Sequence, residues 1–263
     1  MSHLPGIKRI RTRYRSPETD IRVVDVYPER HRYLQFGESL QGAFALDDPD
    51  YAVFEYVALM HVVSELRPWK SALVAGLGAG STAQLLMRSH PYSELTVVEQ
   101  NAQVVELAHR FFRLPRKMDV LCDEIRTYVQ QTGNAYDLIT MDCYGAQMMP
   151  PHLCTREFML ELKACLEPNG WVIWNVWSEA CNDLAGHQLR TIQSAFEYSV
   201  AYHCLEDQNL VVCGSMSKID PHTLQCRGTS YECVDLGDMN VIKEAEVLTD
   251  ENLALVLLDF GVI

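Results

Sequence analysis

Long apolar runs, secretory features and paired-cysteine motifs are all absent from this sequence. No stretch of the 263 residues approaches the roughly 20 consecutive apolar residues of a transmembrane helix, so we expect no membrane span. The N-terminus is basic and leads into no apolar core, which is not the pattern of a secretory signal. The nine cysteines contain neither a Cys-x-x-Cys pair nor a metal-type cluster. These features favour a cytoplasmic protein without a metal site.

Positive charge is scarce as well. The chain carries 22 Lys and Arg residues against 35 Asp and Glu residues, a formal net charge of -13 at pH 7. Such an excess argues against a general nucleic-acid binder and suits a cationic substrate. The charge is uneven, with a basic arm at Lys8–Arg15 and strongly acidic residues in 229–263. We interpret the arm as a solvated or oligomer-contacting segment, with contact to RNA or phosphates as the alternative.

The chain begins with signals for an irregular arm over residues 1–20 and then for a small antiparallel β unit. Its short strands are expected at residues 21–27, 33–36 and 40–44. The turn at residues 47–50 predicts the start of a helix that ends before Pro68. The apolar face of this helix comprises Val53, Tyr56, Val57, Met60 and Val63.

A regular alternation of strands and helices follows. Strands are predicted at residues 71–76, 94–99, 118–122, 136–142, 170–176, 199–205 and 208–214. Helices are predicted at residues 80–90, 101–112, 123–131, 154–167 and 182–197, with Pro168-Asn169-Gly170 as a stop and turn. The last two strands make an antiparallel hairpin. The expected fold class is therefore α/β, a class I methyltransferase-like Rossmann sheet of seven strands after a small antiparallel β unit. One or two helices are expected within 241–258.

A glycine turn follows the first strand of this alternation. Four apolar residues run into Gly76, Gly78 and Gly80, a helical pattern comes next, and the second strand stops at Glu99. Glycines let the backbone turn sharply and approach a ligand closely. An acid about twenty residues further on can accept hydrogen bonds from ribose hydroxyls. The stretch therefore predicts a nucleotide or nucleoside site, and the alternative is a glycine turn needed only for packing.

Acidic residues also follow the next two strands. Asp123 and Glu124 come after the third strand, and Asp142 comes after the fourth. The ligand crevice of an open α/β sheet lies beyond the carboxyl ends of its strands. Asp123 could accept from an adenine amino group, whereas Asp142 could attract a cationic amine, orient it and help remove its proton. The alternative for Glu99 and Asp123 is a helix N-cap or a solvated strand end.

Two reactive side chains lie near Asp142 in the sequence. Cys143 could be a nucleophile, but no histidine is close to it in sequence. His152 could be an acid–base partner, although a loop histidine is more often simply solvent-exposed. No set of residues resembles a metal site or a serine triad.

These features resemble the spermidine synthase (polyamine aminopropyltransferase) family over roughly residues 20–215. The resembling pieces are Phe36-Gly37 with Leu40-Gln41, the turn at 47–49, the helix carrying Tyr56, Gly76–Gly80, Val97-Val98-Glu99, Cys122-Asp123, Tyr136–Asp142 and Phe158–Gly170, with a weaker echo at 248–251. The resemblance implies a Rossmann-like catalytic domain behind a small β domain, in dimers or tetramers. It also implies aminopropyl transfer from decarboxylated S-adenosylmethionine to an amine such as putrescine.

By this resemblance Glu99 binds ribose, Asp123 contacts adenine and Asp142 is the catalytic acid. We place Tyr56 with Asp142 in the catalytic set, and Gln41 with the residues that bind the donor.

The remaining assignments complete the expected layout. Glu124 and the three loop glycines join the donor-binding set. The chain divides into a basic arm and small β domain (1–50), a Rossmann-like domain for an S-adenosylmethionine-type ligand (51–215) and an acidic extension packed on the core (216–263). A homodimer with a small-molecule amine substrate is expected.

Two departures from the family pattern bear on the reaction. The family's glycine loop reads Gly-Gly-Gly-Asp-Gly-Gly, and its Asp, which holds the donor's terminal amine, is replaced by Ala79. The family's Asp-Ser-Ser-Asp-Pro becomes Asp142-Cys-Tyr-Gly-Ala, so Gly145 replaces a second acid. The first change favours intact S-adenosylmethionine, because a helix N-terminus accepts an anion. The second weakens the hold on a diamine.

Three functions stay open on the sequence. Aminopropyl transfer to a polyamine or related amine follows from Asp142 within the family framework. Methyl transfer from S-adenosylmethionine follows from Ala79. A non-catalytic binding or assembly role follows from the two missing acids.

Overall fold

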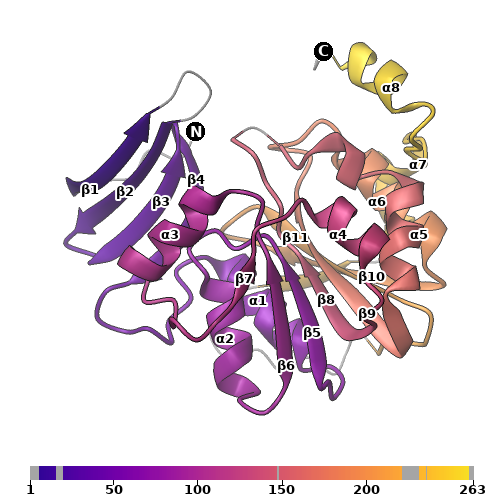
Figure 1. The fold of residues 1–263 in the computed structure, drawn as a ribbon. Helices are drawn as coiled ribbons and strands as arrows, with labels where there is room; N and C mark the ends of the chain where they lie inside the picture. Colours follow the sequence, from indigo (N-terminus) through magenta and orange to yellow (C-terminus); the bar gives the residue numbers. More distant parts are fainter. Residues whose placement is uncertain (1–5, 16–19, 147, 221–230, 235, 261–263) are drawn as a thin grey trace.

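Two β-sheets of unequal size organise the chain (Figure 1). The computed structural model describes residues 6–15, 20–146, 148–220, 231–234 and 236–260. An antiparallel sheet of four strands comes first, and a mixed sheet of eight strands follows with helices on both of its faces. None of the helices within these residues is long and apolar enough to cross a bilayer.

The first sheet is a meander with the strand order β1-β2-β3-β4, and it forms the separate indigo lobe of Figure 1. Its strands are β1 (Ile7–Arg15), β2 (Asp20–Tyr27), β3 (His31–Phe36) and β4 (Ser39–Ala45). The apolar residues inside β2 and β3 are buried, as their sequence pattern predicts, while Tyr27 and Phe36 at the strand ends are half-buried.

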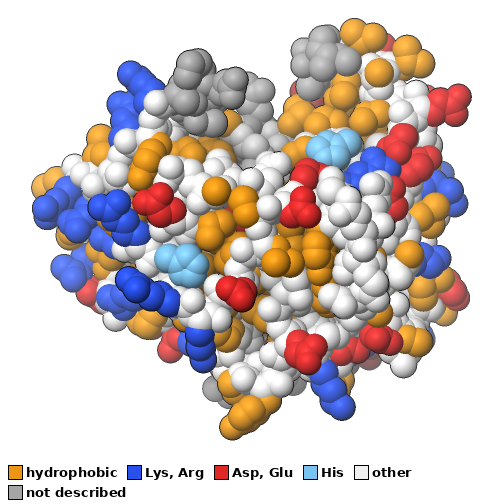
Figure 2. All heavy atoms as spheres, in the orientation of Figure 1, with side chains coloured by type: hydrophobic (Ala, Val, Ile, Leu, Met, Phe, Trp, Pro, Cys, Tyr) orange, Lys and Arg blue, Asp and Glu red, His pale blue; other side chains and the backbone are white. Residues whose placement is uncertain are grey.

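The expectation of an irregular basic arm is wrong for residues 7–15. They form β1, an edge strand that pairs antiparallel with β2. Most of β1 is exposed, and Arg13 forms a two-point ion pair with Asp20 of β2. An exposed, charged edge strand lacks the apolar alternation that identifies strands in a sequence, and its charges discourage pairing with further strands. Figure 2 shows Lys and Arg side chains gathered over this lobe.

The second sheet has the order β12-β10-β11-β9-β8-β5-β6-β7. Its strands are β5 (Ser71–Ala75), β6 (Glu94–Val98), β7 (Val120–Leu121), β8 (Tyr136–Met141), β9 (Leu166–Trp177), β10 (Tyr198–Cys204), β11 (Asn209–Ser215) and β12 (Tyr231–Val234). Strands β5 to β9 run parallel, and β11, β10 and β12 are antiparallel to their neighbours.

The predicted α/β class, its terminal hairpin and the preceding β unit are confirmed. The sheet has eight strands within the described residues, not the expected seven. The additional strand β12 comes from the C-terminal extension and pairs with β10 beyond the hairpin. A strand of four residues at a sheet edge is too short to give a clear periodic pattern.

Helices cover the two faces of the large sheet. They are α1 (Glu55–Ser64), α2 (Ser81–Ser89), α3 (Ala102–Phe111), α4 (Ile125–Gln131), α5 (Arg156–Ala164) and α6 (Ala185–Ala195). Two short helices follow in the C-terminal extension, α7 (Asn240–Lys243) and α8 (Leu253–Asp259). Alternate residues of β5 enter opposite cores. Leu73 and Ala75 pack with α4, α5 and α6, while Ala72 and Val74 pack with α1, α2 and α3. This two-sided burial explains the continuously apolar strand.

Three predicted boundaries are wrong. The helix expected after the turn at 47–50 begins only at Glu55. The strand expected over 118–122 is reduced to β7 at the sheet edge. Strand β9 begins at Leu166, so Pro168–Gly170 lies in its bulged, partly unpaired start and marks no turn between a helix and a strand. Pro is tolerated there because no ladder bond needs its missing N–H group.

The small sheet packs directly on the glycine turn that follows β5. Gly42 of β4 lies against Ala79, and Ser81 at the start of α2 donates a 2.7 Å hydrogen bond to the Ala43 carbonyl. A Cβ added at Gly42 would lie 2.5 Å from the Ala79 nitrogen and 2.6 Å from its Cβ. At this contact the backbone of β4 meets the glycine turn directly, with no room for a side chain at position 42.

We expect Gly42→Ala to destabilise the fold by about 1–3 kcal/mol, because the added methyl group meets rigid backbone. Gly133→Ala is the matched control, since nothing lies within 4 Å of a Cβ placed there. Urea denaturation of both variants measures the free energy of unfolding. Equal stability of the two variants would contradict the close contact between β4 and the glycine turn.

Candidate active site

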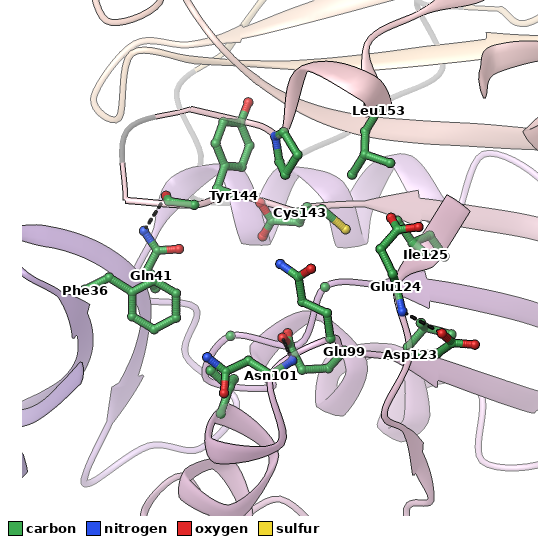
Figure 3. A pocket seen from close by; sticks show the side chains of 18 of the residues that line it. Phe36, Gln41, Glu99, Asn101, Asp123, Glu124, Ile125, Cys143, Tyr144 and Leu153 are labelled. Carbon is green, nitrogen blue, oxygen red and sulfur yellow. Dashed lines mark hydrogen bonds between the residues drawn. The ribbon is translucent and has the colours of Figure 1, made fainter. Parts of the chain in front are cut away.

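A cleft opens at the carboxyl ends of β5, β6, β7 and β8, beside the small sheet (Figure 3). Its empty volume is about 760 Å³, including the part open to solvent, which suits a small-molecule ligand. The cleft is lined by Phe36, Gln41, Gly76, Gly78, Val98, Glu99, Gln100, Asn101, Val104, Asp123, Glu124, Ile125, Asp142, Cys143, Tyr144, Gly145, Pro150, His152 and Leu153. The acids predicted at three successive strand ends thus share one cavity.

The glycine turn forms one wall of the cleft through Gly76 and Gly78. Both have positive φ angles, +86° and +51°, which side-chain-bearing residues rarely adopt. A Cβ on Gly76 would collide with the Asp142 carbonyl, and one on Gly78 would lie 2.5 Å from the Gln41 carbonyl. The third predicted glycine, Gly80, is the N-cap of α2 and is not among the residues that line the cleft.

Glu99 follows β6 and is held by the backbone on both of its carboxylate oxygens. Oε2 accepts from the Leu77 N–H group at 3.0 Å, and Oε1 accepts from the Asn101 N–H group at 2.8 Å. Burial raises the pKa of Glu99, and these hydrogen bonds offset part of that effect. Asn101 is the N-cap of α3, so Glu99 is not the cap that the alternative interpretation required. Each oxygen keeps a lone pair for a ligand hydroxyl.

Glu124 also stabilises the start of α4. It is the N-cap of α4 and accepts from the N–H groups of Arg126 and Thr127 at 3.0 and 2.8 Å. Burial tends to raise the pKa of Glu124, but these bonds and His152, 3.3 Å away, lower it overall. Asp123 accepts from the Glu124 N–H group at 2.8 Å. Contact of Asp123 with adenine stays a prediction.

Asp142 follows β8 and lies at the centre of a hydrogen-bond chain. Its Oδ2 accepts from the Tyr56 hydroxyl at 3.2 Å, and its Oδ1 accepts from the Asn175 amide at 2.8 Å. Asn209 in turn donates to the Asn175 Oδ1 atom at 2.6 Å. Burial raises the pKa of Asp142, and the hydrogen bonds from Asn175 and Tyr56 partly counter it. The carboxylate is thereby oriented and made more basic than a solvated one.

Tyr56 acts on Asp142 from α1. Burial, and then the charge of Asp142, raises the pKa of the Tyr56 phenol well above its usual value, so the phenol stays a proton donor. The backbone N–H group of Tyr56 donates to Asp207 at 3.0 Å. Tyr56 is not among the residues that line the cleft, so we assign it as a residue that positions Asp142.

Asn175 and Asn209 were not predicted from the sequence. Asn175 is 1% exposed and lies near the carboxyl end of β9, between Trp174 and Val176. A buried amide in an apolar strand needs hydrogen-bond partners. An Asn within an apolar run was therefore the sequence pattern that could have indicated a polar contact here.

A second missed feature closes the cleft beside Asp142. The ring of Tyr144 stacks on Trp177 with centroids 4.4 Å apart and an interplanar angle of 9°. Its hydroxyl donates to the Asn175 carbonyl at 3.0 Å and accepts from the Trp177 N–H group at 3.0 Å. Both polar functions of Tyr144 are therefore used within the protein. Gln41 faces it and donates to the Gly145 carbonyl at 3.0 Å.

Cys143 and His152 are the two reactive side chains that lie near Asp142 in the sequence. Burial, and then the nearby carboxylates of Glu99 and Asp142, raises the pKa of the Cys143 thiol well above its usual value, which disfavours a thiolate nucleophile. His152 pairs with Glu124 and has no contact with Asp142. Across the described residues, His, Cys, Asp and Glu side chains form no group of three or more that could hold a metal ion.

Residues 248–251, which resemble the family only weakly, stabilise α4 from outside the cleft. Asp250 and Glu161 both form two-point ion pairs with Arg126 of α4. Leu248 is fully buried, and its carbonyl accepts from the Arg156 N–H group at 2.8 Å. The C-terminal extension thus holds α4, whose first turn carries the cap Glu124.

The fold is a Rossmann-type sheet whose strand-end acids share one cleft. Residues 53–204 match the spermine/spermidine synthase domain, which is more than half of the chain. The chain belongs to this family, as the resemblance indicated.

Individual relatives fall into two groups. The chain is 30% identical to a polyamine aminopropyltransferase of Vibrio vulnificus over 168 residues, 61% of this chain and 55% of that protein. It is 33% identical to an N-terminal histidine N-methyltransferase of Emericella nidulans over 163 residues, 58% of this chain and 29% of that protein. The matched stretch thus spans little more than half of the first relative and less than a third of the second.

Solved structures show the same fold. A probable spermidine synthase from Corynebacterium glutamicum superposes with a TM-score of 0.74, covering 91% of this chain and 96% of that one, at 20% identity. The likeness extends over both sheets and confirms the architecture.

Asp142→Asn is expected to raise the free energy of unfolding at pH 8. A carboxyl group whose pKa is raised by folding binds more protons in the folded state, so its contribution to stability falls as the pH rises through the folded pKa. The advantage of the variant over the wild type should shrink as the pH is lowered toward 4.5. Urea denaturation at both pH values measures it. A pH-independent loss of stability in Asp142→Asn would contradict the raised pKa.

Proposed function

We propose that this protein transfers an aminopropyl group from decarboxylated S-adenosylmethionine to an amine. The observation that carries the proposal is the Asp142 carboxylate, held between Tyr56 and Asn175 in the same cleft as Glu99. Glu99 would accept from the ribose hydroxyls, and Asp123, with Glu124 beside it, would lie near the adenine. These strand ends would place the sulfonium carbon beside Asp142.

The charge of the cleft favours this donor. Its lining includes the carboxylates of Glu99, Asp123, Glu124 and Asp142, and none of the described lining residues is Lys or Arg. Decarboxylated S-adenosylmethionine carries two positive charges, a sulfonium and an ammonium. Intact S-adenosylmethionine adds a carboxylate, which would enter a cleft of the same sign without a cationic partner.

The position of Ala79 does not support the expectation that the helix N-terminus binds the carboxylate of intact S-adenosylmethionine. A helix N-terminus could hold the methionine carboxylate only if its N–H groups faced the cleft. Ala79 is 2% exposed, packs against Gly42 and does not line the cleft, and neither does Gly80. The start of α2 is therefore covered by the small sheet, whichever residue stands at position 79.

The reaction follows from these positions. The acceptor amine binds Asp142 as an ammonium ion and loses a proton to the carboxylate or through it to water. Its nitrogen then attacks the aminopropyl carbon next to sulfur, forming a C–N bond as the C–S bond breaks. The electron pair of that bond goes to sulfur, which leaves as the neutral thioether of methylthioadenosine. The raised pKa of Asp142 makes its carboxylate a stronger proton acceptor than a solvated one.

Methyl transfer is the second candidate, because the chain is also 33% identical to a methyltransferase over 163 residues. The same strand ends would hold intact S-adenosylmethionine, and an amine at Asp142 would attack its methyl carbon. This candidate predicts S-adenosylhomocysteine as the product.

The homodimer and the cytoplasmic location expected from the sequence stay predictions.

Incubation with decarboxylated S-adenosylmethionine and a panel of primary amines should release methylthioadenosine. Asp142→Asn should lower kcat/KM by at least about 100-fold, the usual size of a lost acid–base group. Asp119→Asn, the same change at an exposed residue outside the cleft, should leave kcat/KM unchanged.

The products distinguish the candidates. Release of S-adenosylhomocysteine from intact S-adenosylmethionine, without methylthioadenosine from the decarboxylated donor, would replace the proposal by methyl transfer. Tight donor binding without either product would favour a non-catalytic role.

A further inference from the structure

Among the described residues, the wall of the cleft near the small sheet, opposite Asp123 and Glu124, contains no Asp or Glu. In Figure 3 Phe36 and Gln41 lie on this side, with Tyr144 above them, while Asp123, Glu124 and Ile125 lie on the other. The described residues that line this side are Phe36, Gln41, Tyr144 and Gly145. If the adenosyl group occupies the acidic side, the tail of the acceptor amine extends toward this one.

Tyr144 presents only its ring to such a tail. Its hydroxyl is bonded on both sides to β9, to the Asn175 carbonyl and the Trp177 N–H group. The ring itself is fixed by stacking on Trp177. Phe36 adds a second apolar face. An aromatic surface of this kind favours contact with an alkyl or aryl group.

Gln41 is the polar group of this wall. Its amide nitrogen donates to the Ser39 hydroxyl and the Gly145 carbonyl at 2.9 and 3.0 Å. It is neutral, so it cannot replace a carboxylate as the partner of a desolvated ammonium ion.

Gly145 leaves space in the same wall. Among the described residues, a Cβ added there would meet only the Met148 carbonyl, at an ordinary 3.5 Å, and Gly145 does not have the positive φ angle that disfavours a side chain. Position 145 lines the cleft and has room for a side chain, and in this chain it carries none.

Two acids close to Tyr56 lie outside the cleft. Asp207 accepts from the Tyr56 backbone N–H group at 3.0 Å, and Glu55 accepts from the Glu206 N–H group at 3.0 Å. Both line a separate cavity between α1 and the hairpin turn at residues 205–208. A second ammonium ion on the acceptor would thus reach the side of Phe36 and Tyr144, where no described lining residue is a carboxylate.

We infer that the acceptor is a primary monoamine with an apolar or aromatic tail, bound by its one ammonium group at Asp142. The inference rests on the proposed aminopropyl transfer and specifies its substrate class. Asp142 selects the reacting amine, and Phe36, Tyr144 and the space at Gly145 select the tail. A diamine binds no better through its distal charge, because burial of an unpaired ammonium ion is unfavourable.

Pentylamine and 1,4-diaminobutane test this directly, since they have equal length and differ by a methyl group in place of the distal ammonium. With decarboxylated S-adenosylmethionine as donor, kcat/KM for pentylamine should exceed that for the diamine by about tenfold or more. This is the usual effect of burying a charged group without a hydrogen-bond partner. Binding of both amines to the complex with methylthioadenosine, measured by calorimetry, should show the same preference.

Gly145→Asp should shift the kcat/KM ratio toward the diamine by about tenfold or more, because it supplies a carboxylate in the open space. Gly145→Asn, equal in size and neutral, is the matched control and should not favour the diamine. A wild-type preference for the diamine, or equal shifts with Asp and Asn, overturns the inference but leaves aminopropyl transfer intact. Absence of methylthioadenosine with every amine overturns the proposed function and, with it, the inference.

Discussion

Backbone-to-backbone packing around one glycine turn determines where every group of the cleft lies. Gly76 lies against the Asp142 carbonyl, and Gly78 lies against the Gln41 carbonyl. The residue between them, Leu77, donates its N–H group to Glu99. One short turn therefore sets the positions of the acid after β6, the acid after β8 and the wall supplied by the small sheet. Side chains at these glycines would separate the elements that form the site.

The electrostatic character of the cleft follows from this packing. The turn brings strand-end carboxylates together, and burial keeps the pKa values of Glu99 and Asp142 raised. A cationic ligand relieves the mutual repulsion of these groups, and a ligand carboxylate would add to it. The aromatic pair of Tyr144 and Trp177 closes one side without adding charge. The cleft thus combines a cation-selective centre with one apolar end.

Much of this arrangement was predictable from the sequence because it depends on local order along the chain. A buried parallel strand followed by glycines or an acid predicts a strand end at the ligand crevice, and Glu99, Asp123 and Asp142 do line it. Contacts between distant segments were not predictable in this way. Asn175 and Trp177 donate hydrogen bonds to Asp142 and Tyr144, which lie more than thirty positions away in the sequence. The burial of Ala79 depends on the small sheet, so the sequence suggested an anion site that the fold covers.

The central claim is that the cleft selects a donor of high positive charge. Calorimetric titration of the wild-type protein with decarboxylated and with intact S-adenosylmethionine tests it most directly. The decarboxylated donor should bind with a Kd at least about tenfold lower, which corresponds to roughly 1.4 kcal/mol. Glu99→Gln should weaken the binding of both donors. Equal Kd values for the two donors, or tighter binding of intact S-adenosylmethionine, would contradict the account.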